Sequence, residues 1–216
     1  MRTPQQIRFE AAFHEAAHAA AFYVHGNPVE SIHLMTPEQA ETRHVGELAG
    51  CVIPVQRPIE NVCQAQEAIV ELLAGEAGVR IAQAMHILSN DEIGGTEVPS
   101  ADFALEELTA APNGASPEQG HAYLGWYERA DHPDEVESEK LAYAFTRDGL
   151  EAQALLGYCR ARTTALVGTP RFQNLMLMIG DALLEQSQLS GELTQHLLER
   201  ADTLFEINST TDEGGK

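Results

Sequence analysis

Residues 13–22 read Phe-His-Glu-Ala-Ala-His-Ala-Ala-Ala-Phe, and this stretch decides both the local fold and the chemistry to look for. On an α-helix, side chains four positions apart lie one turn apart on the same face, so the imidazoles of His14 and His18 can converge on one metal ion. The adjacent Glu15 is then placed to take a proton from water that the metal activates. The pattern H-E-x-x-H is typical of zinc peptidases. The alternative is a pair of histidines buried in an ordinary helix core, where they would need polar partners.

The flanking sequence predicts that both histidines lie in the middle of a helix. Thr3 is a suitable N-cap, Pro4 suits the first helical position, and Gln6 completes a capping box. The run between is rich in alanine, the best helix former. Gly26, followed by Asn and Pro, is typical of a helix end.

Length, composition and charge narrow the class of protein. A chain of 216 residues with 44% hydrophobic residues can form one substantial core. A formal charge of −20, with lysine only at positions 140 and 216, argues against a surface that binds nucleic acid. No stretch has the length of a membrane span, and the N-terminus lacks the form of a signal peptide, so we expect a cytoplasmic protein without a membrane partner.

The pattern of apolar residues predicts a mainly α (α+β) fold, with a small β element beside the H-E-x-x-H helix. We expect one domain over residues 1–207 and a disordered tail over 208–216. The acidic run at 131–139 is typical of a solvated helix start. The expected β-rich runs are Val29–Met35 and Val45–Val55, and the expected later helices are Ile59–Leu88, Ala101–Ala110, Tyr123–Arg129, Asp134–Leu166, Pro170–Gln188 and Ser190–Phe205.

A catalytic zinc ion usually takes three protein ligands, so a third side chain must join the two histidines. His25 is one position away from the third histidine of a familiar zinc motif. On a continued helix it would lie about 10 Å along the axis from His18, which is too far to share the ion. Glu71 and Glu76, on the long helix, are two candidates. Asp102, at a helix start after a glycine-rich loop, is another, although such a carboxylate is commonly only a cap. Spacing alone leaves these three open.

Several segments, in order, resemble the peptidase domain of the membrane-bound AAA proteases of the FtsH type (peptidase family M41). The H-E-A-G-H-A of that family is similar to the motif in residues 13–22, with Ala17 in place of its glycine. Its L-A-G-R-A-A-E resembles residues 73–79, which read Leu-Ala-Gly-Glu-Ala-Gly-Val. Its G-A-S-N-D-L resembles residues 99–103, and its A-L-L-E-x-x-x-L-x-G-E resembles residues 182–192.

The resemblance implies roles for particular residues. His14, His18 and Asp102 would be the zinc ligands, and Glu15 would be the general base. The strand region Val45–Val52 would hold an extended substrate by main-chain pairing. An acidic pair of the family is replaced here by Val79 and Arg80, so a carboxylate that supports a histidine would be missing or supplied by Glu71 or Glu76.

The resemblance also implies a function. The chain would be a zinc-dependent metalloendopeptidase that hydrolyses peptides or unfolded proteins. The ATPase and the transmembrane helices of the family are not found in this sequence, so a separate ATPase is a candidate partner, and a ring or a dimer is a candidate assembly. The alternative is a catalytically weak or inactive domain of the same type that acts as a binding or adaptor module.

Overall fold

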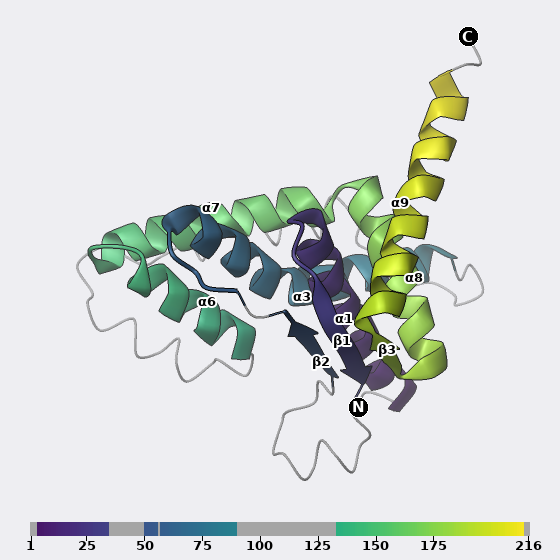
Figure 1. The fold of residues 1–216 in the computed structure, drawn as a ribbon, viewed down its shortest axis with the longest axis horizontal. Coiled ribbons are helices and arrows are strands. Elements are labelled where there is room, and N and C mark those ends of the chain that lie inside the picture. The colour runs from purple at the N-terminus through teal and green to yellow at the C-terminus, as the bar shows by residue number, and fades with distance from the viewer. Residues whose placement is uncertain (1–3, 35–49, 56, 90–132, 214–216) are drawn as a thin grey trace.

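The computed structural model describes residues 4–34, 50–55, 57–89 and 133–213 (Figure 1). This part of the chain is mainly helical with a small antiparallel sheet, which confirms the expected mainly α (α+β) class. The expected helices Ala101–Ala110 and Tyr123–Arg129 lie outside the described residues. The described elements are α1 (Pro4–Val24), β1 (Val29–Leu34), β2 (Gly50–Pro54), α3 (Val62–Ser89), α6 (Pro133–Ala144), α7 (Gly149–Val167), α8 (Pro170–Gln186), β3 (Gln188–Ser190) and α9 (Gly191–Glu213).

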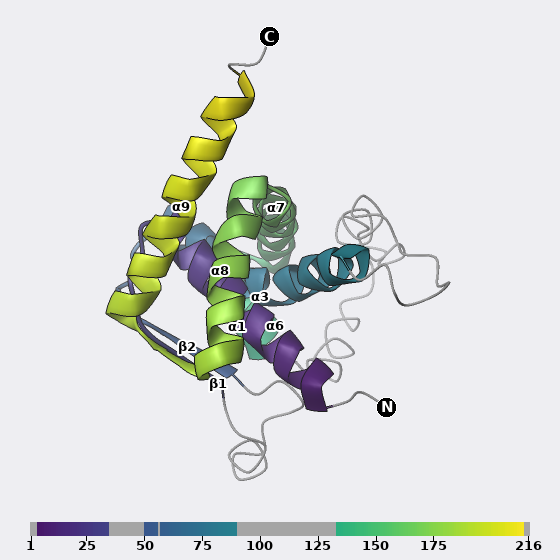
Figure 2. The ribbon, with the colours of Figure 1, turned by 90° about the vertical axis from the view of Figure 1, so that its right-hand side faces the viewer.

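Helix α1 is the centre of the fold, and its alanines explain why it can be. It packs against α3 and α8 and also contacts β1 and β2 (Figure 2). Ala12, Ala16, Ala19 and Ala20 have no exposed surface. Such small side chains allow neighbouring helices to approach closely. The H-E-x-x-H segment is therefore buried on several sides at once.

Helices α1 and α3 approach each other closely at Ala17 and Gly78. A Cβ atom on Gly78 of α3 would collide with the Cβ of Ala17 and would lie 3.0 Å from Sδ of Met176. The methyl group of Ala17 is accommodated because residue 78, opposite it on α3, is a glycine.

The three strands form a sheet in the order β2-β1-β3. In the register of the central strand, Ile32 lies opposite Val52 of β2 and Leu189 of β3. The expected helix Pro170–Gln188 was too long, and β3 was not expected. The helix α8 ends because Ser187 adopts a left-handed conformation with φ of 59°, after which three residues pair with β1.

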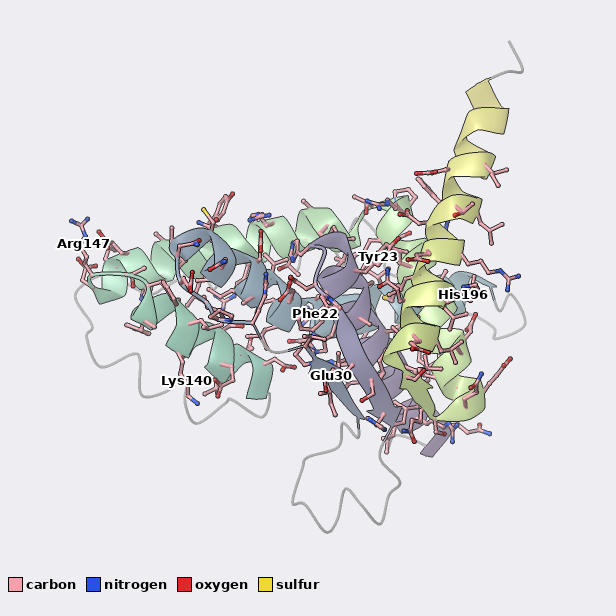
Figure 3. All side chains as sticks on the ribbon, in the orientation of Figure 1. Phe22, Tyr23, Glu30, Lys140, Arg147 and His196 are labelled. Carbon is pink, nitrogen blue, oxygen red and sulfur yellow. The ribbon has the colours of Figure 1, made fainter. Side chains whose placement is uncertain are left out.

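The expected single helix Asp134–Leu166 is wrong, because the chain forms α6 and α7 with a turn between them. The hydroxyl of Thr146 donates to the carbonyl of Ala142, and the carboxylate of Asp148 accepts from the amide of Glu151 as the N-cap of α7. Such side-chain bonds to the backbone compete with a continuous helix. Arg147 marks this turn, at the end of the molecule away from α9 (Figure 3). Both helices pack on α3 through a cluster of buried apolar residues that includes Ile69 of α3, Ala142 of α6 and Leu155 of α7.

The last helix extends further than the sequence suggested. The helix was expected to end at about Phe205, but α9 continues to Glu213. No glycine or proline interrupts the helix before Gly214, so nothing in the backbone ends it earlier. Figure 1 shows the end of α9 projecting away from the other helices. Among the described helices, none combines the length and the apolar character that a membrane span requires.

Candidate metal centre

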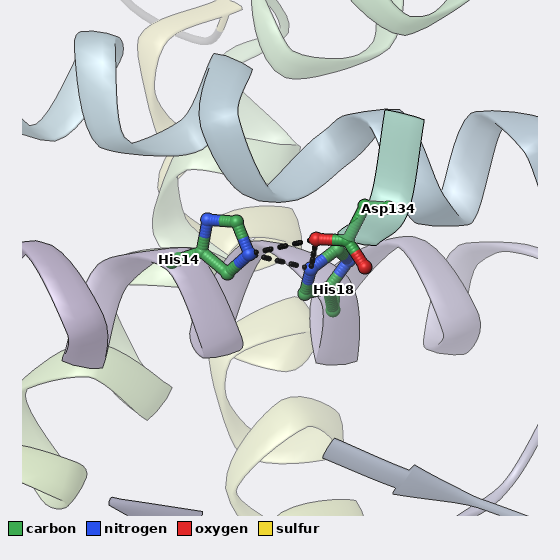
Figure 4. A group of neighbouring side chains, drawn as sticks. All are labelled: His14, His18 and Asp134. Atoms are coloured by element: carbon green, nitrogen blue, oxygen red, sulfur yellow. Dashed lines mark hydrogen bonds and ion pairs between the residues drawn. The ribbon is translucent and has the colours of Figure 1, made fainter. Parts of the chain in front are cut away.

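Three potential metal ligands from two helices meet beside α3. His14 and His18 come from the middle of α1, and Asp134 comes from the first turn of α6 (Figure 4). The two histidines are each 6% exposed, and the side chain of Asp134 is 28% exposed. A carboxylate is favoured in the first turn of a helix, where the backbone amides point toward it. These three side chains form a group that could hold a metal ion.

The distances within this group fit a small ion. Nε2 of His14 lies 3.0 Å from Oδ2 of Asp134, and Nε2 of His18 lies 3.3 Å from the same oxygen. The two Nε2 atoms are 3.0 Å apart. Donor atoms that bind zinc at about 2.0–2.1 Å in a tetrahedron lie about 3.3 Å from one another. The three donors therefore already have the spacing of three corners of a tetrahedral site.

The charges around the group also favour a cation. Burial lowers the pKa of His18, but the hydrogen bond and charge of Asp134, together with the charge of Glu15, outweigh burial and raise that pKa to about 9. Burial raises the pKa of the Asp134 carboxyl, but its hydrogen bonds with His14 and His18 hold the pKa well below its usual range. The metal-free site thus retains a proton on His18, and a metal ion would replace that proton.

Glu15 lies next to this group and is held by β2. The residue is 5% exposed, and burial raises the pKa of its carboxyl to about 7; positively charged His18 and the backbone amide of Val52 act in the opposite direction. A Cβ atom on Gly50 would lie 2.5 Å from Oε1 of Glu15, so the carboxylate packs directly against the strand backbone. A carboxyl with a pKa near neutrality is suited to taking up and releasing a proton.

Gly75 of α3 leaves room beside the Nε2 atoms of the two histidines because it has no side chain. A Cβ atom at this position would lie 2.5 Å from Nε2 of His18 and 2.6 Å from Nε2 of His14. These are the nitrogen atoms that face Asp134. Any side chain at position 75 would therefore occupy the space next to the donor atoms.

A backbone carbonyl supports one of the histidines from the other side. Nδ1 of His18 donates to the carbonyl oxygen of Glu71 at 2.7 Å, which leaves Nε2 as the nitrogen that can bind a metal. Of the two glutamates expected to support the site, Glu71 is thus in contact through its backbone. The carboxylate of Glu76 instead pairs with Arg80 at 2.6 Å and is 41% exposed. His25 is turned toward the carboxylate of Glu71.

The third ligand expected from the family resemblance, Asp102, lies outside the described residues. The acidic run at 131–139 was expected to be a solvated helix start; a helix does start at Pro133, but Asp134 in its first turn also contacts both histidines. Asp134 is 120 positions from His14, so no local spacing links them. Its signal was an acidic residue directly after Pro133 at a helix start, a pattern shared with many ordinary caps. Of the expected substrate strand Val45–Val52, only Gly50–Val52 is described.

A scan against models of protein families found no match to the chain, and a search of curated proteins found no match either.

Proposed function

We propose that the protein is a zinc-dependent metalloendopeptidase that hydrolyses peptide bonds in peptides or unfolded proteins. The observation that carries this proposal is the convergence of His14, His18 and Asp134, with the buried carboxylate of Glu15 beside them. Two histidines and one carboxylate are a common ligand set of hydrolytic zinc. The family resemblance to FtsH-type peptidase domains (peptidase family M41) supports the same activity, and the proposal includes membership of that family.

The proposed third ligand is Asp134. The resemblance alone favours Asp102, but the contacts of Asp134 with both Nε2 atoms support Asp134. Asp134 is also the residue whose charge raises the pKa of His18. Because a bound cation would take the place of that proton, the carboxylate has the same role toward a metal.

The residues of the site suggest a division of labour. A bound zinc ion would supply Lewis-acid chemistry, since it polarises a carbonyl group and makes water more acidic. Glu15 takes a proton from the attacking water and passes it to the nitrogen of the leaving amine. Its pKa near 7 in the metal-free site is compatible with both steps. The amide of Val52 and the close backbone of Gly50 hold its carboxylate in place.

The position of β2 supports an extended polypeptide as the substrate. The strand holds Glu15 and pairs with β1 along one edge. In the described part of the chain, no strand pairs with its other edge. An edge strand offers backbone amides and carbonyls that a peptide in extended conformation can pair with. A substrate that must become extended is a peptide or an unfolded segment.

The proposal is tested with an unfolded substrate such as casein. Zinc-loaded wild-type protein should cleave casein, and a chelator should stop the reaction. Glu15→Gln should retain zinc but lose activity by at least about 100-fold, because it removes the general base. Glu10→Gln, one turn before His14 on the same helix and bonded to Gln83, is the matched control and should keep activity.

Two results decide against the proposal. Casein cleavage by Glu15→Gln at the wild-type rate refutes the assigned role of this residue. Wild-type protein that binds zinc but cleaves no unfolded substrate refutes the peptidase function, and favours instead a binding or adaptor module built on the same site.

A further inference from the structure

Glu71, whose carbonyl contacts His18, also has a buried carboxylate. The side chain of Glu71 on α3 is 3% exposed. Its Oε1 accepts from Nδ1 of His25 at 3.1 Å and from the side-chain amide of Asn27. The guanidinium of Arg57 lies 3.2 and 3.3 Å from its two oxygens. A buried charge with this many partners is fixed in position, because losing any partner leaves part of the charge uncompensated.

The partners of Glu71 come from segments that the site itself needs in place. His25 and Asn27 belong to the turn that ends α1, the helix of the metal-binding histidines. Backbone geometry defines this turn: the main-chain N–H of Asn27 donates to the carbonyl of Phe22, and Gly26 has a left-handed φ of 74°. Arg57 follows β2, the strand that holds Glu15. The carboxylate of Glu71 therefore connects α3 by hydrogen bonds to the turn at the end of α1 and to the segment that follows β2.

The backbone of the same residue contacts the metal centre. The carbonyl of Glu71 accepts from Nδ1 of His18, and Gly75, one helical turn later, clears the space beside Nε2 of His18. Both contacts depend on the position of α3 along and around its axis. A rotation or shift of α3 would lengthen this hydrogen bond and bring other atoms of α3 against the imidazoles.

We propose that Glu71 is a positioning residue of the metal centre, and that its buried carboxylate sets the position of α3 so that its own carbonyl and Gly75 orient His18. This inference rests on the metal site of the proposed function, but not on peptidase activity. Within the described residues, the carboxylate bonds to His25, Asn27 and Arg57, and it acts on His18 through the backbone of α3.

The experiment measures the binding of cobalt(II), whose visible absorption spectrum reports the geometry of its ligands. Glu71→Gln should bind Co²⁺ about 10–100-fold more weakly than wild type and with an altered spectrum, as expected when support behind a ligand is lost. Glu67→Gln is the matched control: it lies one turn earlier on α3, and Glu67 is the other partner of Arg57, at 3.2 Å. Its affinity and spectrum should equal those of wild type.

The measurements are made on protein shown to be folded by circular dichroism. If Glu71→Gln does not fold, Arg57→Gln replaces it; Arg57 is 28% exposed, so its removal disturbs the core less, and it should weaken Co²⁺ binding in the same direction. Wild-type affinity and an unchanged spectrum in the folded variant overturn the inference, even if its melting temperature is lower. Wild-type protein that binds no Co²⁺ overturns this inference together with the metal site. Wild-type protein that binds Co²⁺ but cleaves nothing refutes only the proposed peptidase function.

Discussion

A single methyl group at position 75 should abolish tight metal binding. In Gly75→Ala, the new Cβ would lie 2.5–2.6 Å from the Nε2 atoms of His14 and His18, whereas ordinary contacts of this kind begin near 3.4 Å. The imidazoles must therefore move by about 0.8 Å, and metal–ligand distances tolerate only about 0.2 Å. We expect zinc affinity to fall by at least about 100-fold, which corresponds to about 3 kcal/mol.

The assay is a competition for zinc between the protein and a chromogenic chelator, with thermal unfolding recorded in parallel. Gly157→Ala on α7 is the control, because a Cβ at this exposed position meets no atom within 4 Å. It should leave zinc affinity unchanged and stabilise the helix by about 0.5–1 kcal/mol. Gly75→Ala protein that is folded and binds zinc with wild-type affinity would refute the assigned position of the metal.

Two further predictions concern packing and pH. Gly78→Ala should destabilise the protein by about 1–3 kcal/mol through its clash with Ala17, and adding Ala17→Gly should recover most of that loss. The free energy of unfolding is measured by chemical denaturation. If the double variant loses the sum of the losses of the two single variants, the contact is contradicted. In metal-free protein, the pKa values of Glu15 (about 7) and His18 (about 9) are raised, so the folded state keeps these protons to higher pH than the unfolded state does. The melting temperature should therefore fall as pH rises from 4.5 to 9. Asp134→Asn should remove the part of that fall between pH 6.5 and 9, and a flat wild-type profile there would contradict the His18–Asp134 interaction.

The sequence was sufficient to predict α1 and its buried histidines, because the evidence for them is local. The alanine run, the 3.6-residue repeat and Gly26 all lie within a few turns of the motif. The left-handed Gly26 ends the helix as expected. In contrast, β3 could not be predicted, because its three residues become a strand only by pairing with β1, more than 150 positions earlier. The break between α6 and α7 depends on the bonds of Thr146 and Asp148, which a periodic apolar pattern does not reveal.

The site was predictable to the extent that its residues are neighbours in sequence. His14 and His18 share one helix face and Glu15 is adjacent to His14 in the chain, but Asp134 reaches them only because α6 packs on α3. The glycines that shape the site, Gly50 and Gly75, have no side chain whose pattern could mark them. Their roles follow from what a Cβ would contact in the folded chain.

The central claim is that Asp134 completes a metal site with His14 and His18. The most direct test is the zinc content, by atomic absorption, of wild type, Asp134→Ala and Asp102→Ala after reconstitution and dialysis against metal-free buffer. We predict one zinc ion per chain in wild type and in Asp102→Ala, and none in Asp134→Ala. Full zinc content in Asp134→Ala together with its loss in Asp102→Ala would contradict the account.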